Sequence, residues 1–302
     1  SALNVRPEGR YVDATFGRGG HARAILDTLG VGGSLLVLDR DPEAIAAAQG
    51  LMAQDPRVKA MKTPFGALES ALSEARLQGK VDGILFDLGV SSPQLDEPER
   101  GFSFMRDGPL DMRMDSEAQP SAAEWLADAP EQQIADVIYQ LGEERYSRRI
   151  ARAIVKVRTE MAITRTGQLA DIVKQAHPAW EKHKHPAMRT FQAIRMHINN
   201  ELSELDSALE AASNSLATGG RLVVISFHSL EDRMVKKFMA RCAKGDSFPR
   251  GVPVTAAQLK PSLRLIGRPI RPTADEVQVN SRARSAVMRT AEKLEVAAAV
   301  AL

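Results

Sequence analysis

Three aspartates in the first hundred residues each lie where an apolar, strand-like stretch ends. They are Asp13, Asp39 and Asp87. The stretches alternate with helical patterns, which is typical of a parallel sheet, and the carboxyl ends of parallel strands meet at one edge of such a sheet. We therefore expect three carboxylates from separate strands to converge on one crevice. That crevice would favour a ligand with positive charge or amino groups.

A glycine-rich turn follows the first of these aspartates. Residues 13–21 read Asp-Ala-Thr-Phe-Gly-Arg-Gly-Gly-His, and a helical pattern begins directly afterwards. Glycines allow a tight turn and a close approach of a ligand to the backbone, and the start of the helix offers free N–H groups. The spacing Gly17-x-Gly19-x-x-Ala22 also fits a loose dinucleotide-binding pattern, so a nicotinamide cofactor is one interpretation.

The acidic residues around this turn favour a different cofactor. Asp13 lies four residues before Gly17, where a carboxylate would face an amino-bearing group rather than a pyrophosphate. We predict S-adenosylmethionine, which carries an ammonium group and a cationic sulfur. Asp39 suits this cofactor and a nicotinamide cofactor equally, because a carboxylate there accepts both ribose hydroxyls. The structural alternatives are a turn-forming role for Asp13 and helix capping for Asp39, although Asp41, directly before Pro42, is better placed as a cap.

The segment after Asp87 reads Leu-Gly-Val-Ser-Ser-Pro and lies where an amino-methyltransferase holds its target amine. Acceptors for the amine hydrogens help an exocyclic nitrogen to present its lone pair, so Asp87, Ser91 and Ser92 are catalytic candidates. Positioning matters more than acid–base work, because a sulfonium methyl group is already electrophilic. Alternatively, Asp87 contacts the cofactor and the two serines only form a turn.

Histidines supply the remaining candidates. His228 follows another apolar stretch and could touch a substrate phosphate or base, or cap the next helix. His177, His183 and His185 lie in a basic, proline-flanked loop without a nearby cysteine, and we predict no metal site there. The two arginines of segment 280–285 suit phosphate contact or a solvated loop.

Strand-like and helical patterns alternate at both ends of the chain, with helical sequence between them. We expect one long amphipathic helix at 188–212, ended by the glycines at 219 and 220. The result is an α/β fold, a Rossmann-like methyltransferase sheet with an inserted all-helical domain. The predicted parts are 1–115 and 215–302 for the methyltransferase domain and 116–214 for the insert. Strands are expected at 10–14, 34–38, 58–61, 81–86, 221–226, 263–266 and 286–290.

Composition indicates the class of protein and the character of the insert. The 302 residues are 44% hydrophobic and 26% charged, with one cysteine, which fits a globular protein of the reducing cytoplasm. Neither a signal-peptide pattern nor a membrane-length apolar run is present, so no membrane partner is expected. Residues 141–200 hold 12 Lys and Arg against 5 Asp and Glu, although the whole chain carries only +2. This basic middle predicts contact with a polyanion, or forms a solvated helical surface.

Together the motifs resemble the bacterial methyltransferases that modify the exocyclic N4 of a cytosine in small-subunit ribosomal RNA near the decoding centre (the MraW/RsmH type). One departure is Asn280-Ser281-Arg282, where the family commonly has Asn-Pro-Arg. The similarity covers nearly the whole chain. The matching motifs are 11–21, 87–94, 101–115 with Asp111-Met112-Arg113-Met114-Asp115, 189–205, 219–232 and 280–289.

The resemblance implies an S-adenosylmethionine-dependent fold with an inserted helical domain. The partner that it implies is small-subunit ribosomal RNA or the 30S subunit, and a homodimer through an apolar edge of the insert is a further expectation. The resemblance also implies the residues that contact the cofactor, which are Gly19, Gly20, His21, Asp39, Phe65, Asp87 and Gln94.

Two other classes of protein stay open at this point. An NAD-dependent oxidoreductase fits the loose glycine pattern, but it needs a hydride-handling residue that the sequence does not reveal. A non-catalytic RNA-binding assembly factor would keep the cofactor pocket and bind RNA without turnover.

Overall fold

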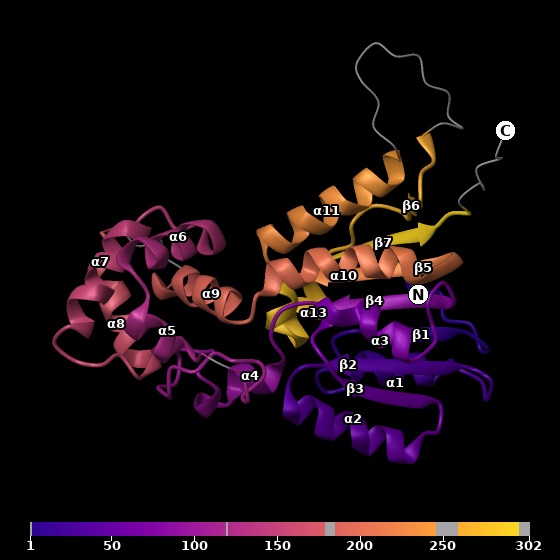
Figure 1. Ribbon diagram of the computed structural model, residues 1–302, viewed down its shortest axis with the longest axis horizontal. Coiled ribbons are helices and arrows are strands. Elements are labelled where there is room, and N and C mark those ends of the chain that lie inside the picture. The colour runs from indigo at the N-terminus through magenta and orange to yellow at the C-terminus, as the bar shows by residue number, and fades with distance from the viewer. Residues whose placement is uncertain (1, 119, 179–184, 246–258, 296–302) are drawn as a thin grey trace, which may run out of the picture. The chain divides into compact units, whose positions relative to one another are not determined.

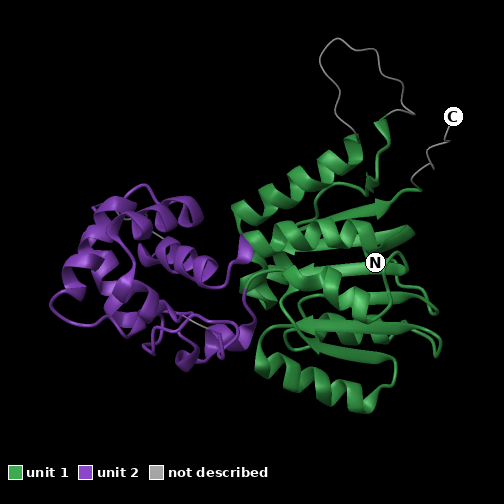
Figure 2. Cartoon of the chain, in the orientation of Figure 1, with its two compact units in different colours: residues 1–89, 203–302 green, residues 90–202 purple. Residues whose placement is uncertain are grey.

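The computed structural model describes residues 2–118, 120–178, 185–245 and 259–295 (Figure 1). The chain forms two compact units, Ser1–Gly89 with Ser203–Leu302, and Val90–Leu202 (Figure 2). The first unit contains the sheet and the second is helical, so a helical unit interrupts an α/β unit, as predicted for the fold class. Among the described residues, every helix is too short or too polar to traverse a bilayer.

One seven-stranded sheet organises the first unit. The strand order is β3-β2-β1-β4-β5-β7-β6. Strands β1 to β5 pair in parallel, whereas β7 runs antiparallel to both β5 and β6. The bounds are β1 Arg10–Asp13, β2 Ser34–Asp39, β3 Val58–Lys62, β4 Val81–Asp87, β5 Leu216–Ser226, β6 Leu263–Leu265 and β7 Val287–Lys293.

The strand order reverses between β1 and β4. The chain adds β2 and β3 on one side of β1 and then returns to place β4 on the other side. In open α/β sheets a ligand binds beyond the carboxyl ends of the strands at such a reversal. The end of β1 carries Asp13 and the end of β4 carries Asp87, so the topology directs attention to these two residues.

Helices cover both faces of the sheet because the strand residues alternate between two cores. Leu35 and Val37 pack with helices α1 (Gly20–Leu26) and α2 (Pro42–Gln54). Their neighbours Leu36 and Leu38 point to the other face, toward α3 (Leu68–Glu74), α10 (Glu201–Ser215) and α11 (Ser229–Lys244). Side chains alternate along a strand, so a run of consecutive apolar residues fills both cores.

The long helix expected at 188–212 is two helices, and that prediction was wrong. Helix α9 (Ala187–Ile198) ends at Asn199, and α10 begins at Glu201 after Asn200, whose φ is 52°. The Asn199 side chain turns to the backbone of another segment, which holds the break in place. The glycines expected to end the helix lie inside β5 instead, and Gly219 has a φ of 80°.

The second unit has its own apolar core, built mainly by α5 (Ala122–Asp128), α6 (Glu131–Gly142), α7 (Ser147–Arg158), α8 (Thr166–Ala176) and α9. Its bounds differ from the predicted insert at 116–214. Leu110 and Met112 lie in this helical core, so the unit begins before residue 116. Leu205 and Leu209 of α10 pack in the sheet core, so the unit ends before residue 214.

Short elements complete the described chain. They are η1 Phe65–Ala67, α4 Ser92–Asp96, η2 Pro98–Arg100, α13 Ala274–Val279 and η3 Ser281–Ser285. Helix α4 and turn η2 both lie in the segment between β4 and α5.

Candidate active site

The three predicted aspartates end three neighbouring strands, β2, β1 and β4. Asp13 pairs in register with Val37 and Leu85, so Asp39 and Asp87 each lie two residues further along. The negative charges of Asp87 and Asp39 both act on Asp13 and favour its protonated form. The structure therefore brings the three carboxylates into one electrostatic cluster, as the sequence predicted.

Asp13 is the most constrained member of the cluster. Its side chain is fully buried, and Oδ1 accepts one hydrogen bond from Thr15 N at 3.2 Å. Oδ2 is buried and has no hydrogen-bond partner among the described residues. The pKa of Asp13 is raised to about 7: burial is the main cause and the charges of the other two aspartates add to it, while the Thr15 hydrogen bond and His21 oppose the shift. Asp13 can therefore accept a further hydrogen bond at Oδ2.

Thr15 joins the ends of β1 and β4, a role that the sequence analysis missed. Asp87 N donates to Thr15 Oγ1 at 2.7 Å, while Thr15 N donates to Asp13. Ala14 N donates to Leu85 O at 2.9 Å and extends the same junction. The only signal in the sequence was the position of a hydroxyl residue two places after a strand-ending aspartate, which is ordinary turn chemistry.

The glycine turn connects β1 to α1 and requires glycine at two positions. Gly17 and Gly19 have φ values of 54° and 75°, in the left-handed region that glycine adopts without strain. A Cβ on Gly19 would also lie 2.6 Å from the Phe16 ring. Gly20 is different, because a Cβ there would meet nothing within 4 Å. The backbone beside Gly20 thus has room for a ligand.

Asp39 holds this turn against β2. Its Oδ2 accepts from Gly17 N at 2.8 Å, and its Oδ1 accepts from Asp41 N at 2.9 Å. Burial raises the pKa of Asp39, and these backbone hydrogen bonds oppose the shift. The capping alternative for Asp39 is wrong, because Asp41 Oδ1 caps α2 by accepting from Glu43 N at 3.0 Å. The Asp39 carboxylate, with about four acceptor positions, can still accept from a hydroxyl group.

His21 of α1 and Asp87 of β4 face each other at the strand ends. His21 Nε2 lies 3.4 Å from Asp87 Oδ2, and the hydrogen bond to Asp87 is the main cause that raises the pKa of His21. Asp87 Oδ1 is buried without a hydrogen-bond partner among the described residues. Two of the three strand-ending carboxylates therefore each keep one buried oxygen that lacks a donor.

Phe65 offers an apolar surface at the end of β3. It begins the turn η1 and packs edge-on against Phe86 of β4, with ring centroids 6.1 Å apart and an interplanar angle of 83°. Phe65 is only partly buried, so part of the ring is open to solvent. An aromatic face of this kind suits stacking against a flat heterocycle.

Ser91, Ser92 and Gln94 belong to the second unit, where they form the start of α4. Gln94 is buried, and its Oε1 accepts from Ser91 N at 2.8 Å. Ser91 is the N-cap residue and Ser92 the first residue of the helix. Ser91 and Ser92 therefore start a short helix, and the interpretation that they have only a structural role is not tested. The catalytic roles predicted for them stay predictions.

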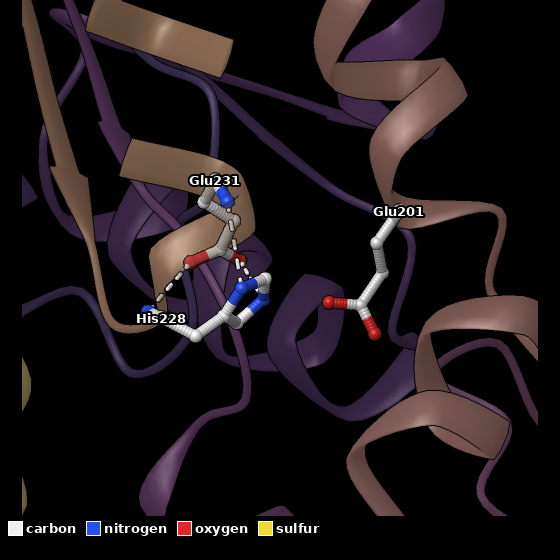
Figure 3. A group of neighbouring side chains, drawn as sticks. All are labelled: Glu201, His228 and Glu231. Carbon is white, nitrogen blue, oxygen red and sulfur yellow. Dashed lines mark hydrogen bonds and ion pairs between the residues drawn. The ribbon is translucent and has the colours of Figure 1, made fainter. Parts of the chain in front are cut away.

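His228 caps α11, which was the alternative interpretation of this residue. Its Nδ1 accepts from Glu231 N at 3.4 Å, and its Nε2 lies 3.0 Å from Glu231 Oε1 (Figure 3). Glu231 Oε2 accepts in turn from Phe227 N at 2.9 Å. These contacts fix the ring, because both nitrogens face groups of Glu231. Of the histidines in the basic loop, His177 Nε2 lies 3.5 Å from Glu144 Oε2. His183 lies outside the described residues.

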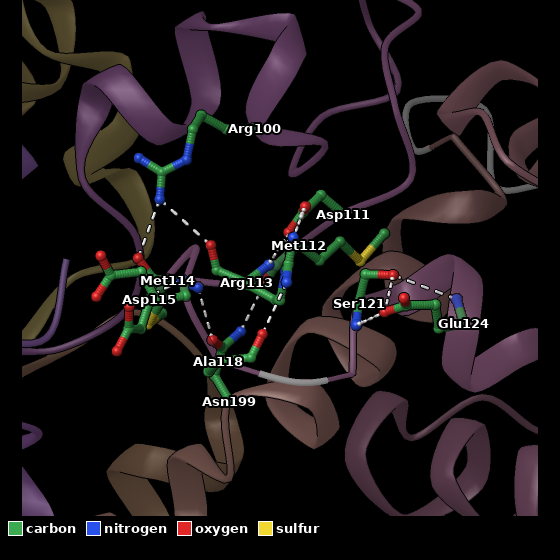
Figure 4. Close-up of polar contacts among 11 residues, drawn as sticks. Arg100, Asp111, Met112, Arg113, Met114, Asp115, Ala118, Ser121, Glu124 and Asn199 are labelled. Carbon is green, nitrogen blue, oxygen red and sulfur yellow. Dashed lines mark hydrogen bonds and ion pairs between the residues drawn. The ribbon is translucent and has the colours of Figure 1, made fainter. Parts of the chain in front are cut away.

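The motif Asp111–Asp115 forms a closed network within the second unit (Figure 4). Arg113 holds Asp111 through two hydrogen bonds of 2.8 and 2.6 Å and donates to Ala118 O at 2.7 Å. Asn199 accepts from Met114 N and donates to Met112 O, both at 2.8 Å. Arg100 donates to two carbonyl oxygens of the same segment. These contacts fasten the segment to α9, so its polar groups serve the architecture.

Comparison with known proteins decides the family. The sequence model of the MraW methylase family matches residues 1–294. The chain belongs to the MraW methylase family. Among solved structures, an rRNA methylase from Streptococcus thermophilus is similar over 96% of this chain and 90% of that chain, with 12% identity and a TM-score of 0.40. Aeropyrum pernix fibrillarin, solved with S-adenosyl-L-methionine, is similar over 96% and 68%, with 10% identity and a TM-score of 0.38.

Membership of the MraW methylase family selects between the alternatives left by the sequence. The chain is an S-adenosylmethionine-dependent methyltransferase, and the NAD-dependent oxidoreductase interpretation is wrong. Membership also supports methylation of ribosomal RNA as the class of activity. The carboxylates at the strand ends fit this cofactor. Buried oxygens of Asp13 and Asp87 lack hydrogen-bond donors among the described residues, and the ammonium group of the cofactor can donate to them.

Proposed function

We propose that this member of the MraW methylase family methylates the exocyclic N4 amine of a cytosine in small-subunit ribosomal RNA, near the decoding centre. The substrate is that RNA, free or within the 30S subunit. The observation that carries the proposal is the cluster of strand-ending carboxylates with two unpartnered buried oxygens beside a glycine turn. Such a cluster suits a cationic donor on one side and an amine on the other.

The cofactor would be held by residues of the first unit. Asp13 and Asp87 would accept from its ammonium group, Asp39 from its ribose hydroxyls, and the backbone at Gly19 and Gly20 would lie against it. Phe65 would pack on the adenine, and His21 would hold the Asp87 carboxylate in place through their 3.4 Å contact. When bound, the cofactor supplies an electrophilic methyl group.

The chain's own residues would prepare the amine. The lone pair of a cytosine N4 is delocalised into the ring, and acceptors on its hydrogens favour the pyramidal form that can attack a methyl group. Asp87 is the first candidate acceptor, and the hydroxyls of Ser91 and Ser92 are the next. The target base must leave its stack to reach such a site. The arginines of segment 280–285 would contact the RNA phosphate.

The decisive experiment measures methyl transfer from labelled S-adenosylmethionine into small-subunit ribosomal RNA and maps the product by mass spectrometry. We expect one N4-methylated cytosine, and we expect Asp87→Ala to lose activity by at least a hundredfold. Asp206→Ala is the control, because Asp206 is an exposed carboxylate of α10. Full activity of Asp87→Ala would contradict the assigned role. Tight binding of RNA and cofactor without any methyl transfer would indicate the non-catalytic assembly factor instead.

A further inference from the structure

Helix α7 of the second unit carries a row of exposed cations. Arg148, Arg149, Arg152 and Lys156 are all exposed, and α7 contains no acidic residue. At 100° per residue they occupy an arc of about 100°, and they extend over about 12 Å of helix. These four residues are called the α7 stripe below. The opposite side of the helix, with Ile150, Ala151 and Ile154, is fully buried in the core of the unit.

The α7 stripe has few partners within the protein. No side-chain hydrogen bond or ion pair joins Arg148, Arg149 or Lys156 to the part of the chain that the structure describes. Arg152 faces Glu131 at 3.7 Å, but the side chains are 78% and 44% exposed, so solvent screens that pair. The stripe therefore presents nearly all of its positive charge to solvent.

The arrangement of the α7 stripe is unfavourable for the helix itself. Arg148 and Arg152, and Arg152 and Lys156, are like-charge pairs four residues apart, which destabilise a helix. Arg148 and Arg149 also lie in the first turn, where the macrodipole disfavours cations, and that turn has no acidic residue. The nearby carboxylate of Glu144 is buried and lies 3.5 Å from His177 Nε2 and 3.9 Å from Arg189 Nη1. Folding alone gives no reason for four cations here.

From these observations we infer that the α7 stripe binds the phosphate backbone of the RNA substrate. This inference rests on the proposed function and names the surface that holds the substrate. A row of cations fits a linear polyanion, in which phosphates repeat along the strand and each contact releases a counterion. A membrane surface is the weaker match, because an interfacial helix needs a free apolar face and the apolar face of α7 is occupied by the core.

The test compares the double variant Arg148→Gln/Arg149→Gln with the unchanged protein. Binding to a small-subunit ribosomal RNA transcript is measured by fluorescence anisotropy at several salt concentrations. We expect affinity to fall about tenfold at moderate salt and the slope of log K against log salt to become shallower by between one and two units. The melting temperature should stay equal or rise, because the like-charge repulsion is relieved. A loss of binding caused by misfolding would instead lower it.

Two control proteins sharpen the result. Lys236→Gln/Lys237→Gln removes two adjacent exposed cations from α11 and should change RNA affinity by less than threefold. Arg148→Lys/Arg149→Lys keeps the charge and should retain most of the binding. An equal loss in the α11 variant would show a general charge effect and overturn the inference. Weaker binding to vesicles of phosphatidylserine and phosphatidylcholine, with RNA affinity unchanged, would overturn it in favour of a membrane.

The inference about the α7 stripe and the proposed methylation can fail independently of each other. If the unchanged protein methylates the RNA and the Gln variant matches it in affinity and salt slope, the α7 stripe is not the binding surface and the methylation proposal stands. If the unchanged protein binds RNA through the stripe but transfers no methyl group, the inference holds and the methylation proposal fails.

Discussion

The strand-end carboxylates of the first unit and the Asp111–Asp115 network of the second unit use polar side chains in opposite ways. In the network, Arg113 donates to a carboxylate and a carbonyl group, and Asn199 both accepts from a backbone N–H and donates to a carbonyl group, all within the same unit. At the strand ends, Asp13 and Asp87 each keep one buried oxygen without a donor among the described residues. A buried acceptor that lacks a donor costs stability, so it persists where a ligand completes it.

This difference distinguishes polar residues that hold the fold together from polar residues that bind a ligand. A polar motif whose hydrogen bonds close within the fold needs no ligand to explain it. A buried carboxylate whose pKa is raised to about 7 by its surroundings is one that the fold disfavours in its charged form. Substitutions in the two regions should therefore have opposite effects on stability.

The largest effect is expected from Asn199→Ala. This change leaves the backbone groups of Met114 and Met112 without partners in a buried place, which costs about 3 kcal/mol of the free energy of unfolding. Denaturant unfolding followed by circular dichroism measures the loss. Asn214→Ala is the control, because Asn214 is an exposed residue of α10 and should change stability by less than about 0.5 kcal/mol. A neutral Asn199→Ala would mean that the network does not hold the unit together.

The opposite sign is expected from Asp13→Asn. The folded-state pKa of Asp13 is raised to about 7, well above the ordinary value of an aspartate, so the stability contributed by the protonated form is lost as pH rises through 7. Asparagine does not titrate, and at pH 8 the variant should be more stable than the unchanged protein by about 1–3 kcal/mol. The advantage should shrink toward zero by pH 4. Thermal unfolding without cofactor, at pH 4 and pH 8, measures both values, and a variant less stable at pH 8 would contradict the assignment.

The first unit could be predicted from the sequence because its signals are local. Short apolar runs, the proline after Asp41 and the glycines after Phe16 act within a few residues. The structure confirms the strands and the α2 cap that they predicted. The convergence of Asp13, Asp39 and Asp87 follows from the same local reasoning, because parallel strands place their carboxyl ends together.

The features that the sequence analysis missed depend on distant partners. The break between α9 and α10 is held by the hydrogen bonds between Asn199 and the backbone of Met114 and Met112. These partners lie 85 and 87 positions earlier in the chain. Nothing in the apolar spacing of 188–212 reveals such a partner, so the periodic pattern predicts one continuous helix. Thr15 was missed for the same reason, since the group that it accepts from lies 72 positions away at Asp87.

A smaller effect is expected on the pH dependence of cofactor binding. A cationic ligand stabilises the Asp13 carboxylate, so the pKa of Asp13 should be lower in the complex than the value of about 7 without ligand. The affinity for S-adenosylmethionine should therefore rise with pH up to about 7, by at most about tenfold per unit, and then level off. Isothermal titration calorimetry from pH 5.5 to pH 8 measures the slope.

Two variants identify the titrating group behind that slope. Asp13→Asn should bind more weakly and show no slope in this range. His21→Gln removes the histidine beside Asp87, whose pKa is also raised, and should keep the slope, whatever its affinity. A slope that disappears with His21 and survives without Asp13 would assign the pH dependence to the histidine.

The smallest effect, and the sharpest test of where the ligand lies, is expected from Gly20→Ala. Gly20 begins α1, its φ lies outside the left-handed region, and an added Cβ would meet no protein atom within 4 Å. The variant should fold with unchanged or slightly higher stability, since alanine favours a helix. A cofactor lying against this backbone would meet the new methyl group, so affinity should fall several-fold, roughly 1 kcal/mol. Gly50→Ala is the matched control, because Gly50 is a helical glycine with equally open surroundings in α2. Equal cofactor affinity in both variants would place the ligand away from Gly20. The unpartnered oxygens of Asp13 and Asp87 would then need a different explanation.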